Sequence, residues 1–158
     1  MKVNPVGKRL PSISGQTLSS SRVRFPEDLL GFPSVLLIAY RRGTQQDLDR
    51  WIEFLSLKAP QLVWYEVPAI RNLIWRPLAG WIDAGMRNGV PQDKWSRVVT
   101  LYEGAAKLGE FIGDNGMDLT HLVVLNSDGI VAWFNPNGYS EEAASELLEL
   151  LQRLAMRA

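Results

Sequence analysis

The sequence predicts an α/β fold in which a central mixed β-sheet carries helices on both faces. Short apolar runs alternate with segments of helical spacing, as expected for a sheet built through a βαβ unit. Near the C-terminus, two apolar runs joined by a short glycine-containing turn and followed by a helical segment predict a ββα unit. The chain has 158 residues, close to the usual size of one domain, so we expect a single domain over residues 1–158.

The first 33 residues predict an irregular or edge-strand lead-in. Prolines, serines and glycines are frequent there, which favours turns and short strands over long elements. The core is therefore expected over residues 34–156.

The segment after the lead-in predicts a buried strand followed by a helix. Residues 35–40 (VLLIAY) form an unbroken apolar run, which is typical of a strand covered on both faces. Thr44 and Asp47 then match the Ser/Thr-x-x-acid pattern found at helix N-termini, and helical spacing continues to Lys58. We therefore expect a helix whose first turn is capped by Thr44 and Asp47.

The middle of the chain predicts a second strand, a helix, a third strand and a short helix. The second strand is expected over residues 62–67 (LVWYEV). Because proline fits the first turn of a helix, the next helix is expected to begin at Pro77 and to end at Asn88–Gly89. The third strand is expected over residues 97–102 and the short helix over residues 104–112.

The C-terminal segment carries the clearest pattern. Residues 121–125 and 130–134 flank a turn over residues 126–129, where glycine supplies the positive φ of a hairpin. Ser140 is expected to cap the terminal helix. The apolar stripe of that helix consists of Ala144, Leu147, Leu148, Leu151 and Leu154.

This order of elements resembles the thioredoxin-like layout. In that layout a redox cysteine pair follows the first central strand, which corresponds here to residues 44–47, and a proline, usually cis, stands where this chain has Thr120. The sequence contains no cysteine, and thiol–disulfide exchange requires a thiolate. We therefore expect a redox-inactive protein that is not an enzyme, with an ordinary trans peptide bond between Leu119 and Thr120.

Three stretches resemble the mitochondrial ATP synthase assembly factors, a thioredoxin-like family without the cysteine pair. They are RRGTQQDLDRW at residues 41–51, RNGVP at residues 87–91, and residues 108–134, which include LGEFIGDN and NSDGIVAWF. The resemblance covers residues 35–154 in outline. It implies a chaperone for the membrane sector of that complex, or a bacterial-type relative with another client.

Charge, hydropathy and residue counts exclude several classes of partner, cofactor and location. Seventeen basic and seventeen acidic residues cancel, so no overall field favours nucleic acid. No segment reaches the roughly 20 apolar residues that span a bilayer, and the N-terminus has no apolar signal region, so we expect a cytoplasmic protein without a membrane span. With no cysteine, a single histidine (His121) and no calcium-loop spacing at residues 114–118, the sequence predicts no metal site and no cofactor.

We predict a protein-binding or assembly-chaperone-type function, with a subunit of a membrane complex as a candidate partner. Loops that leave the ends of the central strands converge at one edge, and tryptophan and arginine are enriched at interface hot spots. The alternative is a small-molecule binder or enzyme with an anion site at Arg41, Arg42 and the helix N-terminus at Thr44. The candidate binding residues are Tyr40, Arg41, Arg42, Thr44, Trp75, Trp95, Leu119, Thr120 and Tyr139.

Overall fold

The computed structural model describes residues 3–70, 86, 92–114, 116 and 118–156. Strands and helices alternate along most of this length. In chain order they are β1 (Ile13–Thr17), β2 (Arg22–Phe25), the 3₁₀ helix η1 (Glu27–Leu29), β3 (Ser34–Ala39), the 3₁₀ helix η2 (Arg42–Thr44), α1 (Gln45–Lys58), β4 (Val63–Pro68), the 3₁₀ helix η4 (Gln92–Arg97), β5 (Val99–Thr100), α3 (Ala105–Ile112), β6 (His121–Leu125), β7 (Val131–Asn135) and α4 (Glu141–Met156).

The strands form two hydrogen-bonded sheets that meet along β4 and β5. One sheet has the order β4, β3, β6, β7, and the other has the order β2, β1, β5. β3 is parallel to β4 and antiparallel to β6, so the βαβ and ββα units predicted from the sequence are both present. Isolated parallel bridges, Glu66 to Val98 and Ala69 to Leu101, connect the two sheets.

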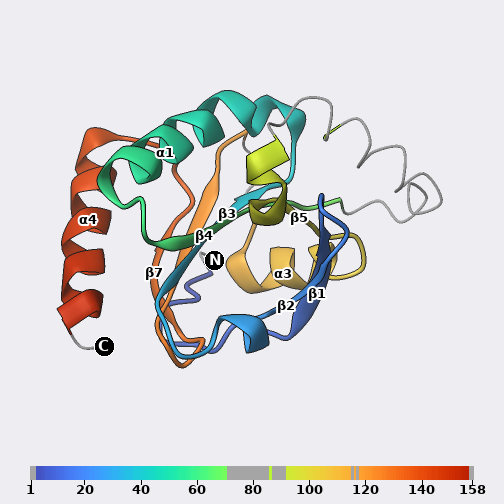
Figure 1. Ribbon diagram of the computed structural model, residues 1–158, viewed down its shortest axis with the longest axis horizontal. Helices are drawn as coiled ribbons and strands as arrows, with labels where there is room; N and C mark the ends of the chain where they lie inside the picture. Colours follow the sequence, from blue (N-terminus) through green and yellow to red (C-terminus); the bar gives the residue numbers. More distant parts are fainter. Residues whose placement is uncertain (1–2, 71–85, 87–91, 115, 117, 157–158) are drawn as a thin grey trace.

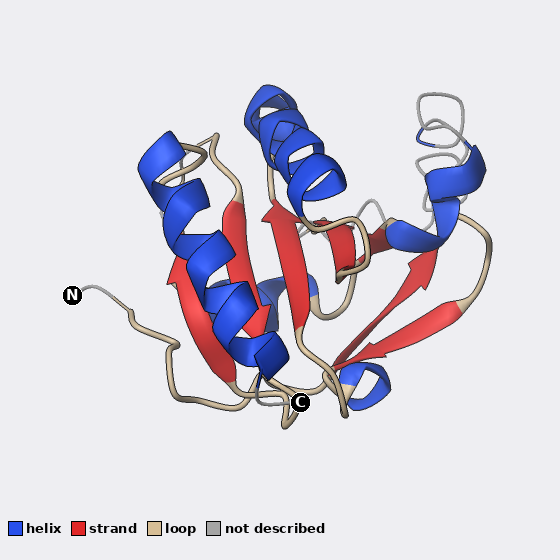
Figure 2. Cartoon of the chain, turned by 60° about the vertical axis from the view of Figure 1, so that its left-hand side comes forward, coloured by secondary structure: helices blue, strands red, loops and turns tan. Residues whose placement is uncertain are grey.

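Helices cover both faces of the sheet that contains β3 (Figures 1 and 2). α1 and α4 lie on one face, and α3 lies on the other. Alternate side chains of a strand point to opposite faces. Val35 and Leu37 accordingly pack in the cluster with α1 and α4, whereas Leu36 and Ile38 pack in the cluster with α3. This two-sided burial is the reason that residues 35–39 of β3 are all apolar.

The N-terminal lead-in contains the expected edge strands. β1 and β2 form an antiparallel hairpin, and β1 also pairs with β5. Before β1, the chain runs along the start of β7, where Gly7 N–H donates to the Val131 carbonyl (2.8 Å) and Val131 N–H donates to the Lys8 carbonyl (2.9 Å). The lead-in therefore contributes to both sheets.

In the middle segment, one strand is shorter than predicted, and one predicted helix lies outside the described residues. β5 covers only Val99–Thr100, because the residues before it form η4 and β1 offers a partner for two residues only. The helix predicted from Pro77 to Gly89 lies outside the described residues. Within the described ranges, no helix is both long and apolar enough to cross a membrane.

Candidate functional site

The edge that would carry a redox centre is organised by the carboxylate of Asp47. This residue lies in the first turn of α1, shortly after the end of β3. Its Oδ2 accepts a hydrogen bond from Thr120 N–H (3.0 Å), and its Oδ1 accepts one from Tyr139 N–H (2.8 Å). One side chain therefore connects α1 to the segment before β6 and to the turn before α4.

The predicted capping of α1 by Thr44 and Asp47 is wrong. Thr44 is the N-cap residue, but its backbone is helical (φ −73°, ψ −15°) and its side chain makes no capping hydrogen bond. A capping side chain normally reaches the first amides of the helix from an extended backbone. Thr44 instead ends the η2 turn, and its buried hydroxyl has no hydrogen-bond partner within the described part of the chain.

The residue at position 120 makes the Asp47 contact possible. The Leu119–Thr120 peptide bond is trans, as expected; among the described residues the cis bond is Phe25–Pro26. A proline at position 120 would have no N–H to donate to the Asp47 carboxylate. The carboxylate at position 47 and the non-proline residue at position 120 thus depend on each other, since together they form one hydrogen bond.

The turn before α4 approaches Asp47 so closely that position 138 requires glycine. Gly138 has φ +80°, and a Cβ atom there would lie 2.8 Å from both Asp47 Oδ1 and Leu119 Cδ2. The Asn135 side-chain amide donates to the Gly138 carbonyl at 2.9 Å, which holds the turn in this position. The sequence predicted a turn here but not its contact with α1.

A second polar cluster joins the end of β3 to the start of β6. Arg41 Nη1 donates to Asp114 Oδ1 (3.1 Å), and Arg41 Nη2 donates to Asp114 Oδ2 (2.5 Å). His121 Nε2 lies 3.6 Å from Asp114 Oδ1. The Asp114 and His121 side chains are 1% and 0% exposed, whereas the Arg41 side chain is 30% exposed. A buried carboxylate is therefore paired with a cation that reaches the surface.

This pairing keeps Asp114 ionised. Burial by itself raises the pKa of Asp114, but hydrogen bonds from Arg41 and Gly116 N–H and the charge of Arg41 outweigh burial and lower the pKa below its ordinary value. The same hydrogen bonds raise the pKa of Arg41. Because Asp114 occupies the guanidinium fork, an anionic ligand at Arg41 would compete with an internal carboxylate.

The tyrosines of this edge have packing roles. Tyr40 O–H donates to the Ala105 carbonyl at 2.8 Å, which links β3 to α3. The Tyr139 ring lies edge-on to Trp51, with 5.0 Å between ring centroids, and the Arg50 guanidinium carbon lies 4.6 Å from the Tyr139 centroid. Both tyrosines are half-buried, so each presents only part of its ring to a partner.

The structure brings together most of the predicted site residues but separates the tryptophans from them. Trp95 is half-buried on η4, away from this edge, and its carbonyl accepts a hydrogen bond from Leu18 N–H. Trp75 and the side chain of Arg42 lie outside the described part, so their roles in binding stay predictions, as does that of Trp95. The residues that do converge at the edge are Tyr40, Arg41, Thr44, Leu119, Thr120 and Tyr139.

Sequence reasoning missed a perturbed carboxyl on β4. Burial raises the pKa of Glu66 to about 7, Asp49 adds to the rise, and Lys94 and a hydrogen bond from Gln45 oppose it. The signal was present in the sequence, because Glu66 is the acidic residue within the otherwise apolar and aromatic run LVWYEV.

Replacing Glu66 with glutamine is expected to raise the free energy of unfolding by about 2 kcal/mol at pH 8, since one pKa unit corresponds to roughly 1.4 kcal/mol and partial exposure reduces the effect. In the folded state Glu66 keeps its proton up to about pH 7, whereas in the unfolded state it loses the proton near its ordinary value of 4.5. Wild-type stability therefore falls as the pH rises through this window, and the Glu66→Gln difference should vanish near pH 4. Urea unfolding at several pH values measures this difference in the free energy of unfolding.

The exposed Glu53 of α1 provides the control. Glu53→Gln is expected to change the free energy of unfolding by less than about 0.5 kcal/mol, as surface substitutions usually do. A Glu66→Gln difference that is constant from pH 4 to pH 8 would contradict a raised pKa.

Comparison with known proteins identifies the fold. No protein-family model matches the chain, and no curated protein matches it. A thiol:disulfide interchange protein from Bacteroides sp. has a similar solution structure, with a TM-score of 0.64 at 13% identity over 96% of this chain and 93% of that chain. BsSco, a member of the Sco family of cytochrome c oxidase assembly proteins, has a TM-score of 0.63 at 12% identity over 99% and 98% of the two chains.

A third similar structure is the exposed lipoprotein thioredoxin Etrx1 from Streptococcus pneumoniae strain TIGR4, with a TM-score of 0.60 at 13% identity over 89% of this chain and 99% of that chain. These likenesses show that the chain has a thioredoxin-like fold. It is a cysteine-free version of that fold, so it supplies no thiolate for redox chemistry. Among the described residues, no group of three or more His, Cys, Asp or Glu side chains is placed to hold a metal ion.

Proposed function

We propose that this protein binds another protein through the edge that carries the redox centre in thioredoxins. The redox-edge surface consists of Gly43, Asp118, Leu119, Asn137 and Tyr139. Gly43, Asp118 and Asn137 are exposed, and Leu119 and Tyr139 are half-buried. The observation that carries the proposal is the pair of hydrogen bonds at Asp47, which hold the loops bearing these residues together.

A surface of this kind suits binding better than catalysis. Binding is stronger when the contacting loops are already ordered, because less conformational freedom is lost on association. Asp47 and Asp114 both fix loops here, and their carboxylates are engaged in doing so. The Asp47 and Asp114 carboxylates therefore position a surface at this edge and are not free to act as an acid or a base.

The finer proposal is an assembly-chaperone role with a membrane-complex subunit as client. Support comes from the ATP synthase assembly factor resemblance in residues 41–51 and 108–134. BsSco, whose fold is similar, is described as one of a family of cytochrome c oxidase assembly proteins, so this fold is compatible with an assembly function.

Affinity capture from the native host tests the proposal. The wild-type chain is expected to retain a defined set of proteins. Asn137→Arg and Leu119→Glu should each reduce the recovery of these proteins about tenfold. A bulky or charged side chain at the centre of an interface lowers the binding free energy by more than about 1 kcal/mol. Quantitative mass spectrometry of the retained proteins measures the change. Recovery of ATP synthase subunits would support the finer proposal.

Leu57→Glu is the matched control, because Leu57 is 71% exposed on the last turn of α1, away from the redox-edge surface. It should leave the recovery unchanged. The proposal fails if the wild type retains no specific protein, or if all three variants retain the same proteins in equal amounts.

A further inference from the structure

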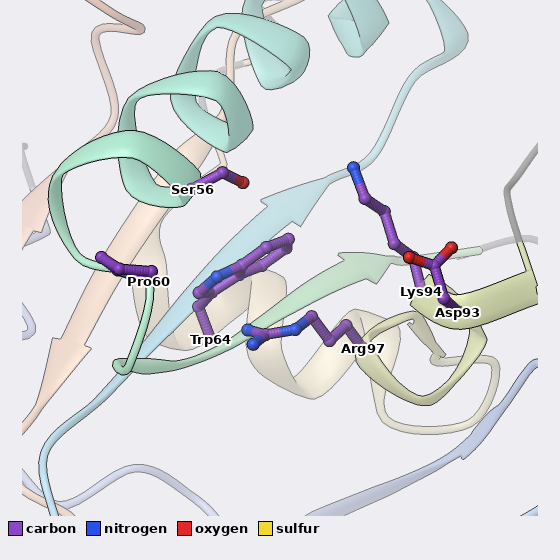
Figure 3. A pocket seen from close by; sticks show the side chains of 6 residues that line it. All are labelled: Ser56, Pro60, Trp64, Asp93, Lys94 and Arg97. Atoms are coloured by element: carbon purple, nitrogen blue, oxygen red, sulfur yellow. The ribbon is translucent and has the colours of Figure 1, made fainter.

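A polar groove lies between the C-terminal end of α1 and η4, with β4 as its floor (Figure 3). It has a volume of about 330 Å³. The side chains that line it belong to Ser56, Pro60, Trp64, Asp93, Lys94 and Arg97.

The two cations of the groove come from one wall. η4 is a 3₁₀ helix, in which residues three positions apart lie on the same side, so Lys94 and Arg97 both line the cavity. Within the described part of the chain, neither forms a salt bridge; the salt bridges found there involve Arg24, Arg41 and His121. No described carboxylate therefore pairs with either cation.

Trp64 holds one of these cations in place. The Arg97 guanidinium carbon lies 4.5 Å from the centroid of the Trp64 ring, and Trp64 is only 5% exposed. A cation over an aromatic face is attracted by the ring, while the N–H groups at the edge of the guanidinium can still donate hydrogen bonds. Arg97 is thus fixed over a rigid floor before any ligand arrives.

The acidic residues near the groove do not neutralise the positive charge of Lys94 and Arg97. Asp93 is the one carboxylate among the lining residues. Glu66 follows Trp64 on the same face of β4, and because its pKa is raised to about 7 it is partly protonated near neutral pH. The described lining residues, with two cations and one carboxylate, therefore carry a net positive charge.

We propose that this groove is a binding site for a carboxylate group, which Arg97 and Lys94 would pair with while the Ser56 hydroxyl donates from the opposite wall. The guanidinium fork matches the geometry of a carboxylate. The volume is at the lower end of the roughly 300–1,000 Å³ of ligand pockets, which suits a small dicarboxylic acid or the acidic side chains of a peptide.

Titration of the full chain with two probes tests the site. The probes are succinate and a tetraglutamate peptide with blocked termini, and the readouts are calorimetry and the Trp64 indole N–H resonance. At least one probe is expected to bind saturably. Lys94→Ala and Arg97→Gln should each weaken binding about tenfold, since a charge-assisted hydrogen bond contributes roughly that factor or more. Arg153→Ala, which removes an exposed cation on α4, should have no effect.

The outcome of the titration distinguishes the two kinds of ligand and tests the site itself. Binding of succinate alone assigns the site to a free organic acid, and binding of the peptide alone assigns it to an acidic segment of a protein. Saturation by neither probe overturns the proposal, as does an affinity in the Lys94→Ala variant equal to that of the wild type. Because Lys94 is exposed, weaker binding in that variant is not explained by misfolding. These purified probes make the result independent of partner capture at the redox-edge surface.

A pH dependence provides a second readout. Glu66 faces Lys94 from β4, with Asp49 and Gln45 of α1 beside it. Ionised Glu66 would attract Lys94 and weaken carboxylate binding, so affinity should fall as the pH rises from 6 to 8. Glu66→Gln should abolish this fall, and an unchanged pH profile in that variant would contradict the assignment of Lys94 to the ligand.

Discussion

Replacing Asp114 with alanine is expected to lower the free energy of unfolding by about 3 kcal/mol. The substitution removes both hydrogen bonds to Arg41 and leaves that guanidinium without its buried partner, and breaking a buried ion pair in this way costs roughly 3–5 kcal/mol. The lower end of the range applies because Arg41 is 30% exposed and can be rehydrated. Chemical denaturation followed by circular dichroism measures the loss.

The pH dependence of this effect has a definite sign. Since the pKa of Asp114 is lower in the folded state than in the unfolded state, its ionised carboxylate stabilises the fold above about pH 4. That contribution is lost as the pH falls through the folded-state pKa. Asp114→Asn should therefore differ most from the wild type at neutral pH and least in acid.

Asp128 in the β6–β7 turn is an exposed carboxylate that serves as the control. Asp128→Ala should change stability by less than about 0.5 kcal/mol, as surface substitutions usually do. If Asp114→Ala is equally mild, the Arg41–Asp114 pair does not stabilise the contact between the segment after β3 and the segment after α3.

Replacing Asp47 with alanine is expected to lower the free energy of unfolding by about 2–4 kcal/mol. Two backbone N–H groups, those of Thr120 and Tyr139, would lose their acceptor, and an unsatisfied buried donor costs roughly 1–3 kcal/mol. Asp47→Asn should give an intermediate loss, because the amide keeps one acceptor oxygen. Equilibrium unfolding in urea measures both variants.

Glu53→Ala, an exposed substitution on the same helix, sets the baseline for this series. Amide hydrogen exchange adds a local readout, since the N–H groups of Thr120 and Tyr139 should exchange faster in Asp47→Ala than in Glu53→Ala. Equal exchange at both amides would show that Asp47 does not hold these loops.

The fold could be predicted from the sequence because its elements carry local signals. β3 is apolar from Val35 onward, and the β6–β7 hairpin has Gly129 at a positive φ of +77°. Ser140 accepts a hydrogen bond from Ala143 N–H, as a helix cap should. β5 was less predictable, since its length depends on pairing with β1 from a distant part of the chain. Local pattern does not contain that information.

The candidate site was harder to predict because its main contacts join distant residues. Thr44 and Asp47 fit a capping pattern in sequence, yet Asp47 is engaged by amides 73 and 92 residues further along the chain. The spacing of residues 114–118 argued against a calcium loop but did not indicate that Asp114 is the buried partner of Arg41. Both carboxylates have roles that only the tertiary arrangement defines.

The contact between the N-terminal segment and β7 also has a consequence for the behaviour of the protein in solution. An open sheet edge offers unpaired backbone groups on which a second chain can add a strand, which is a common route to aggregation. Here the hydrogen bonds between Val131 and residues 7 and 8 occupy the start of that edge. The lead-in, predicted as irregular or as edge strands, thus covers part of the sheet edge against self-association. The proposed binding surface lies at the other end of the strands.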